Sequence, residues 1–139
     1  MKNFCLLVLC GFIAGTLLAR IESAYAVAPF KKEFEAKYVK KDPATPEETA
    51  LAVAVKQAKC NVCHVGKKKK DRNAYGKALS ELLDRKKDKK DKAKIQEALD
   101  TVAELKSNPE DPTSPTFGKL ISQGKLPCGK EPTTQTAAK

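Results

Sequence analysis

The sequence predicts an all-α protein of four to five short helices, and three observations support this prediction. Apolar residues recur at three- and four-residue intervals in several segments, and residues that favour helix starts precede these segments. No segment shows the alternating pattern of a half-buried strand. The chain has 139 residues, which corresponds to one domain with short extensions.

The N-terminal region differs from the rest of the chain. Lys2 precedes an almost wholly apolar run from residue 4 to 19, and Ala24-Tyr25-Ala26 places small residues at the positions that a signal peptidase reads. The apolar run is shorter than the roughly 20 residues that a membrane-spanning helix needs. Residues 1–26 therefore predict a removable signal peptide, no transmembrane anchor after its removal, and a periplasmic or otherwise exported protein.

The mature chain is expected to have three parts. Residues 27–44 form an N-terminal helix and linker, residues 45–128 the main domain, and residues 129–139 a polar, disordered tail. Phe30, Phe34 and Tyr38, at i, i+4 and i+8, predict one face of the first helix. The next helix is expected to begin at Thr45, an N-cap followed by Pro at the first and Glu at the third helical position, and to reach about residue 59.

Three more helices are expected after residue 70. Asn73 predicts the start of the first of them, and the second follows the charge block 86–92 and ends near Lys106. A proline-rich loop covers residues 108–115, and Ser114-Pro115 starts a last short helix that Gly124 ends. The expected inward-facing residues of the three helices are Tyr75, Leu79, Leu82, Leu83, Ile95, Leu99, Val102, Leu105, Phe117, Leu120 and Ile121.

The motif that indicates a specific chemical function is Cys60-Asn61-Val62-Cys63-His64, a C-x-x-C-H sequence typical of covalent haem c attachment. Two thiols three positions apart at the end of a helix can both reach the vinyl groups on one porphyrin edge. The next residue, His64, then lies under the iron and can bind it through an imidazole nitrogen. Haem of this type is attached after export, so the motif and the signal peptide support each other.

Two other interpretations of the cysteines compete with haem. A Cys60–Cys63 disulfide of the thioredoxin type would need a strand before the motif, whereas a capped helix is expected there. A zinc ion could use Cys60, Cys63, His64 and Cys128, but adjacent ligands at 63 and 64 would fit one ion poorly.

The segment from Thr45 to Leu126 resembles the small, soluble, class I monohaem cytochromes c, in their lysine-rich bacterial form. The resemblance rests on the helix that leads into CNVCH and on the segment Lys70 to Leu79. It implies a helical domain wrapped around one covalent haem c, with Cys60 and Cys63 as thioether residues and His64 as axial iron ligand. It also implies a one-electron carrier whose iron cycles between Fe(III) and Fe(II), and no enzymatic activity.

The chain departs from that family in the sixth iron ligand. The family has a methionine there, but Met1 is the only methionine and His64 the only histidine. The remaining candidates are one of the many lysines (Lys106 and Lys119 among them), Cys128, Tyr75, the mature N-terminal amine and water. An open distal position would favour the alternative function, a haem protein that binds or senses a small gas.

Lysines dominate the charge. The formal net charge is +10, and it becomes +9 when Lys2, Arg20 and Glu22 leave with the signal peptide. Two lysine-rich runs, 67–70 and 86–92, predict either a solvated surface or a positive rim that steers docking onto acidic redox partner proteins. A nucleic-acid partner is not expected, because no aromatic residues interleave with these lysines.

Overall fold

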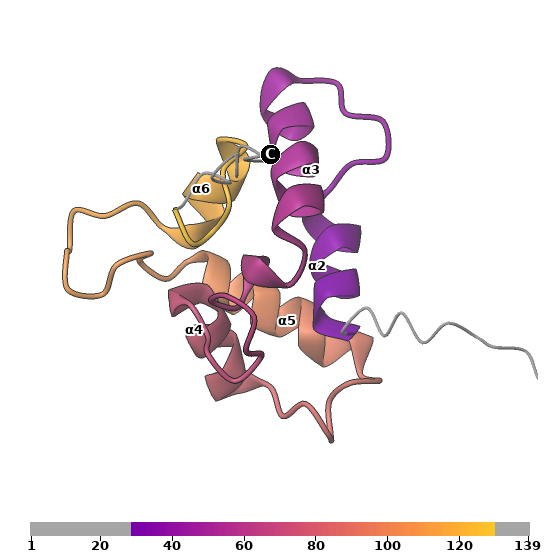
Figure 1. The fold of residues 1–139 in the computed structure, drawn as a ribbon, viewed down its shortest axis with the longest axis vertical. Coiled ribbons are helices and arrows are strands. Elements are labelled where there is room, and N and C mark those ends of the chain that lie inside the picture. Colours follow the sequence, from indigo (N-terminus) through magenta and orange to yellow (C-terminus); the bar gives the residue numbers. More distant parts are fainter. Residues whose placement is uncertain (1–28, 130–139) are drawn as a thin grey trace, which may run out of the picture.

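The computed structural model describes residues 29–129, and this part of the chain is helical without strands (Figure 1). The prediction of an all-α fold is confirmed for this part. The signal peptide and residues 130–139 of the expected tail lie outside the described residues. The elements are α2 (Pro29–Tyr38), α3 (Pro46–Ala58), the 3₁₀ helix η1 (Lys59–Val62), α4 (Ala74–Leu82), α5 (Lys92–Ala103) and α6 (Phe117–Ser122).

Side-chain caps fix where the helices begin, as the sequence predicted for α3 and α4. The hydroxyl of Thr45 accepts a hydrogen bond from the backbone N–H of Glu48 at 3.2 Å. The Glu48 carboxylate in turn accepts one from the N–H of Ala44 at 2.8 Å, one residue before the cap. Asn73 caps α4 by accepting from the N–H of Gly76 at 2.9 Å. These bonds use N–H groups that a helix start leaves without partners.

Helix α5 crosses the middle of the molecule and packs against α2, α4 and α6 (Figure 1). Three aromatic rings meet in the core, one from each of these helices: Phe34, Tyr75 and Phe117. Their centroids lie 5.8 Å apart for Phe34 and Tyr75 and 5.2 Å apart for Tyr75 and Phe117, both edge to face. Such pairs add about 0.5–1.5 kcal/mol each beyond the area they bury. The aromatic cluster therefore joins three helices that are far apart in sequence.

Polar contacts hold α2 on α5. The Tyr38 hydroxyl donates to the carbonyl oxygen of Leu99 at 3.1 Å, and the Gln96 amide donates to the backbone oxygen of Glu33 at 3.2 Å. Burial, with smaller contributions from Asp100 and Glu104, raises the pKa of Tyr38 to about 12, so the phenol stays a donor at neutral pH. Phe34 and Tyr38 thus serve helix packing.

Two of the expected inward-facing residues are exposed, which corrects the sequence prediction. Leu82 is 40% exposed because Leu79 and Leu83, one turn apart, take the core positions. Leu105 is 46% exposed because α5 ends at Ala103, earlier than the predicted Lys106. After Ala103 the chain turns, and the Leu105 carbonyl instead accepts from the N–H of Phe117 at 3.0 Å.

The start of α6 also differs from the prediction. Thr116 is its N-cap and accepts from the N–H of Lys119 at 3.2 Å. Ser114, the expected start, is buried and closes the proline-rich loop: its hydroxyl donates to the Asn108 carbonyl at 3.0 Å and accepts from the Asn108 N–H at 3.2 Å. The loop itself and the end at Gly124 (φ 75°) agree with the prediction.

Candidate functional site

The C-x-x-C-H motif forms one tight turn at the end of α3. Lys59, with φ 51°, ends the helix, and among the described residues it is the non-glycine with positive φ. The backbone N–H groups of Cys63 and His64 both donate to the carbonyl of Cys60, at 3.3 and 3.1 Å. The positive φ of Lys59 is a strained conformation for a non-glycine residue, and such a conformation persists only where the surrounding structure imposes it. The turn brings all three motif side chains to one end of α3.

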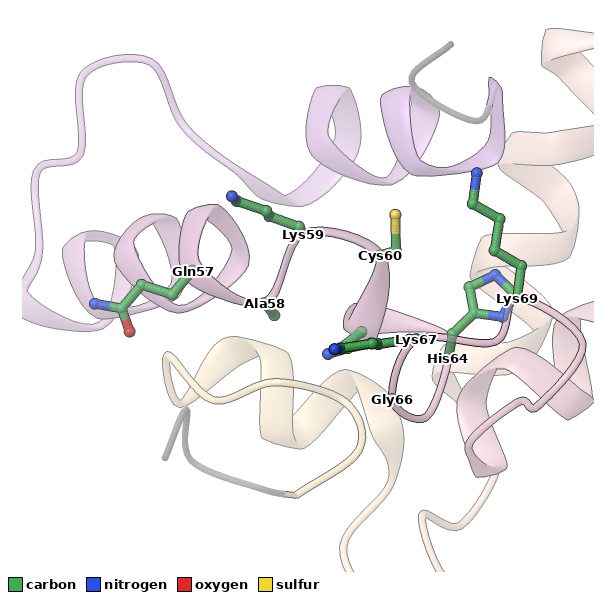
Figure 2. Close-up of a pocket in the computed structure, with 9 residues that line it drawn as sticks. Gln57, Ala58, Lys59, Cys60, His64, Gly66, Lys67 and Lys69 are labelled. Carbon is green, nitrogen blue, oxygen red and sulfur yellow. The ribbon is translucent and has the colours of Figure 1, made fainter. Parts of the chain in front are cut away.

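Cys60 and His64 line a common open pocket of about 350 Å³ (Figure 2). Lysines surround it: Lys59, Lys67 and Lys69 are part of its lining. The Nδ1 atom of His64 is buried and has no hydrogen-bond partner within the described residues. Nε2 is therefore the ring nitrogen left to bind a ligand from the pocket.

Cys63 has different surroundings from Cys60. Cys60 is exposed, whereas Cys63 packs against the hydrophobic core and does not line the pocket. Burial, with smaller contributions from Cys128 and Cys60, raises the pKa of the Cys63 thiol to about 12. The structure thus brings Cys60 and His64 together but directs Cys63 toward the core.

Asn73 fastens the motif turn to α4. Its side-chain amide donates to the carbonyls of Asn61 at 3.2 Å and Val62 at 3.0 Å, and its backbone N–H donates to the carbonyl of Cys63 at 3.2 Å. We call these contacts of Asn73 with the motif turn the clamp. The sequence predicted Asn73 as a helix cap but did not predict the clamp, because a capping pattern says nothing about a contact twelve residues away. Gly76 completes the attachment, since its backbone lies directly on the carbonyl of Cys63.

Replacing Asn73 with alanine is expected to lower the free energy of unfolding by about 2–3 kcal/mol. The lost cap contributes about 1 kcal/mol, and each lost bond from the amide contributes about 1 kcal/mol. Urea unfolding followed by circular dichroism measures the change. Thr116→Ala is the control, because it removes a cap alone and should cost about 1 kcal/mol. Equal losses in the two variants would contradict the clamp.

The Tyr75 hydroxyl is a second buried polar group without a partner in the described part of the chain. The side chain is completely buried, and burial raises its pKa far above the usual value, with smaller contributions from Tyr38 and Cys63. A buried hydroxyl that makes no hydrogen bond costs about 1–3 kcal/mol.

Tyr75→Phe is therefore expected to raise the free energy of unfolding by about 1 kcal/mol, because it removes the unpaired hydroxyl and keeps the ring. Tyr38→Phe is the matched control and should lower it by a similar amount, since it breaks the bond to Leu99. Both are measured by urea unfolding. A loss of stability in Tyr75→Phe would mean that the hydroxyl has a partner.

Of the sixth-ligand candidates named from the sequence, Lys106, Lys119, Tyr75 and Cys128 do not line the pocket of Cys60 and His64, whereas three other lysines, Lys59, Lys67 and Lys69, do. Lys106 donates instead to the carbonyl of Ser114 at 3.0 Å, and Lys119 is exposed on α6. Tyr75 is enclosed by the aromatic cluster, and Cys128 packs against the core. The mature N-terminal amine lies outside the described residues.

The competing interpretations of the cysteines gain no support. Within residues 29–129 no group of three or more His, Cys, Asp or Glu side chains is arranged to hold a metal ion, which lends no support to a zinc site with Cys60, Cys63, His64 and Cys128. A helix and a 3₁₀ turn, not a strand, lead into Cys60, which is unlike a thioredoxin-type disulfide site.

No helix in the described part of the chain is long and apolar enough to cross a membrane.

The donor set suits covalent haem attachment with one departure. Two thiols and an imidazole lie on one turn, and Cys60 and His64 share a pocket, but the Cys63 sulfur would have to turn out of the core to join them. Comparisons with protein-family models, curated proteins and solved structures found no match to this chain.

Proposed function

We propose that this chain is an exported monohaem c-type cytochrome that carries single electrons. The observation that carries the proposal is the motif turn, which presents Cys60 and His64 to one pocket at the end of a capped helix. When bound, a haem supplies an iron that cycles between Fe(III) and Fe(II).

Each motif residue has a distinct part in this proposal. The thiols of Cys60 and Cys63 form the two thioether bonds, and Nε2 of His64 binds the iron. Nδ1 is buried, so Nε2 is the nitrogen that we assign to the iron. Asn73 and Gly76 hold the backbone of the turn from which His64 extends.

The lysines around the pocket support docking onto an acidic redox partner. Lys67 and Lys69 line the pocket and are exposed, and Lys68 and Lys70 beside them are exposed as well. A rim of one charge speeds association with an oppositely charged protein and loses this effect as salt screens it. Glutamine substitutions at all four lysines should slow reduction by an acidic electron donor at low salt and leave the rate at high salt nearly unchanged.

A gas-binding haem protein is the second candidate, because Lys106, Lys119, Tyr75 and Cys128 do not line the pocket with His64 and the lysines that do line it are exposed. Addition of carbon monoxide to the reduced protein separates the two functions. A slow or partial shift of the absorption bands supports an electron carrier with a strong sixth ligand. A rapid, complete shift supports the gas-binding protein.

The exported protein tests haem attachment directly. Expressed with haem-attachment machinery, it should give a c-type pyridine haemochrome and a haem-stained band that survives denaturing electrophoresis. An exported protein without covalent haem would overturn the proposal.

A further inference from the structure

The lysine-rich connection between α4 and α5 is a folded loop. Two aspartates hold its backbone from within. The Asp84 carboxylate accepts hydrogen bonds from the N–H groups of Lys86 and Lys87, at 2.7 and 2.9 Å. The buried Asp88 carboxylate accepts one from the N–H of Asp84 at 2.7 Å and pairs with the ammonium group of Lys94 at 3.0 Å. Both carboxylates are thus engaged inside the loop.

Backbone bonds give this loop a defined path between the two helices. The N–H of Asp88 donates to the carbonyl of Asp84 at 2.8 Å, and the N–H of Asp91 donates to the carbonyl of Asp88 at 3.0 Å. Asp91 then caps α5 by accepting from the N–H of Lys94 at 3.0 Å. Hydrogen bonds from backbone N–H groups, joined at Asp88 by Lys94, lower the pKa of the Asp84 and Asp88 carboxyls. Both therefore stay ionised at neutral pH and keep these bonds.

The basic side chains of the loop have no such partners. Ion pairs within residues 29–129 involve Lys31, Lys37 and Lys94. The basic residues between Asp84 and Asp91 are all exposed and belong to none of these pairs: Arg85, Lys86, Lys87, Lys89 and Lys90. We call these five residues the loop cations. They do not line the pocket of Cys60 and His64, and their loop forms the lower edge of the molecule in Figure 1.

An exposed leucine adjoins the loop cations. Leu82, the last residue of α4, is 40% exposed and lies two positions before Asp84. Four of the five loop cations are lysines, which carry their charge on flexible stems without the fixed fork of arginine. Such charges suit an array of phosphates that has no fixed geometry, and an aliphatic side chain beside them suits an apolar layer below it. This combination is typical of segments that lie at a membrane surface.

We propose that the α4–α5 loop binds the surface of an anionic phospholipid bilayer through the loop cations and Leu82. The cations pair with lipid phosphates, and Leu82 enters the boundary between headgroups and acyl chains. Each lysine close to an anionic surface contributes roughly fivefold to the affinity. The loop lies outside the pocket of Cys60 and His64, so this contact goes beyond the proposed function and does not depend on it.

Vesicle binding by the exported full-length chain tests the proposal. Sedimentation with vesicles of phosphatidylglycerol and phosphatidylcholine measures the partition coefficient, and vesicles of phosphatidylcholine alone measure binding without lipid charge. The loop variant has glutamine in place of the four loop lysines: Lys86, Lys87, Lys89 and Lys90. The control variant has the same net charge and glutamine in place of four exposed lysines on other segments: Lys41, Lys56, Lys119 and Lys125.

We expect the unsubstituted chain to bind the anionic vesicles and to leave the neutral ones unbound at about 0.1 M salt. The partition coefficient of the loop variant should fall by at least about thirtyfold, and that of the control variant by less than about fivefold. Equal losses would show that net charge alone determines binding, and would overturn the proposal. A loop variant with unchanged vesicle affinity would overturn it as well and would leave the loop cations to an acidic protein partner.

A second pair of variants separates a bilayer from an acidic protein surface. Leu82→Ala should lower the partition coefficient by about fivefold, because less apolar surface leaves water. Leu105→Ala is the matched control, since Leu105 is 46% exposed and follows the opposite end of α5, and it should leave the coefficient unchanged. Binding that does not respond to Leu82→Ala would contradict the proposed contact with the acyl boundary. Vesicle binding is measured without reference to haem, so this proposal and the proposed function can fail independently.

Discussion

Replacing Cys60 and Cys63 together with alanine is expected to abolish covalent haem in the exported protein. In the proposed cytochrome, thioether bonds to these two sulfurs are the covalent attachment, so a double variant could hold haem only through His64 and non-covalent contacts. The haem-stained band after denaturing electrophoresis should fall below detection. The same protein preparation should release any remaining haem into acidic acetone.

The single cysteine variants and Cys128→Ala refine this test. Each motif single variant keeps one thioether, so it should retain stained haem with a pyridine haemochrome shifted to longer wavelength. Cys128→Ala should keep two thioethers and the spectrum of the unsubstituted protein. Covalent haem in the double variant would show that the motif is not the attachment site, and loss of haem in Cys128→Ala would show that Cys128 is part of it.

Gly76→Ala is expected to lower the free energy of unfolding by about 2–4 kcal/mol. A Cβ atom at this position would lie 2.0 Å from the carbonyl oxygen of Cys63, far inside van der Waals contact. Helix propensity alone would predict the opposite sign, a gain of up to about 1 kcal/mol. Overpacking against a fixed backbone typically costs about 1–3 kcal/mol, and a shift of α4 would also weaken the bonds of Asn73.

Urea unfolding of the haem-loaded and haem-free proteins measures this change. Ser80→Ala, on the exposed side of the same helix, is the matched control and should change stability by less than about 0.5 kcal/mol. The haem yield of Gly76→Ala should fall as well, because the motif turn loses its support. A Gly76→Ala protein as stable as the unsubstituted one would show that α4 does not lie on the turn.

Much of the helical architecture was accessible from local sequence patterns. Thr45 and Asn73 are N-caps as predicted, and Gly124 ends the last helix with a positive φ. These features depend on a few adjacent residues, which is why sequence alone can reveal them. Leu105 shows the limit: its spacing continues the helical pattern, but α5 has already ended, so the side chain is exposed.

The site was only partly predictable for the same reason. The spacing of Cys60, Cys63 and His64 defines the motif, and a local turn brings Cys60 and His64 to one pocket. The surroundings of the two thiols depend on contacts made elsewhere. Cys63 packs against the core, and Gly76 of α4 lies on its backbone carbonyl; neither contact leaves a periodic or spacing signal.

The amino-acid sequence by itself determined the helical class, the starts of α3 and α4, and the C-x-x-C-H motif from which haem attachment is proposed, because each depends on neighbours within one or two turns. Tertiary structure alone decided that Asn73 clamps the motif, that Tyr75 and His64 bury polar atoms that have no partner within residues 29–129, and that Cys63 packs against the core. These outcomes arise from packing between residues far apart in the chain. Such packing depends on the shape of the whole interior, which local patterns do not encode.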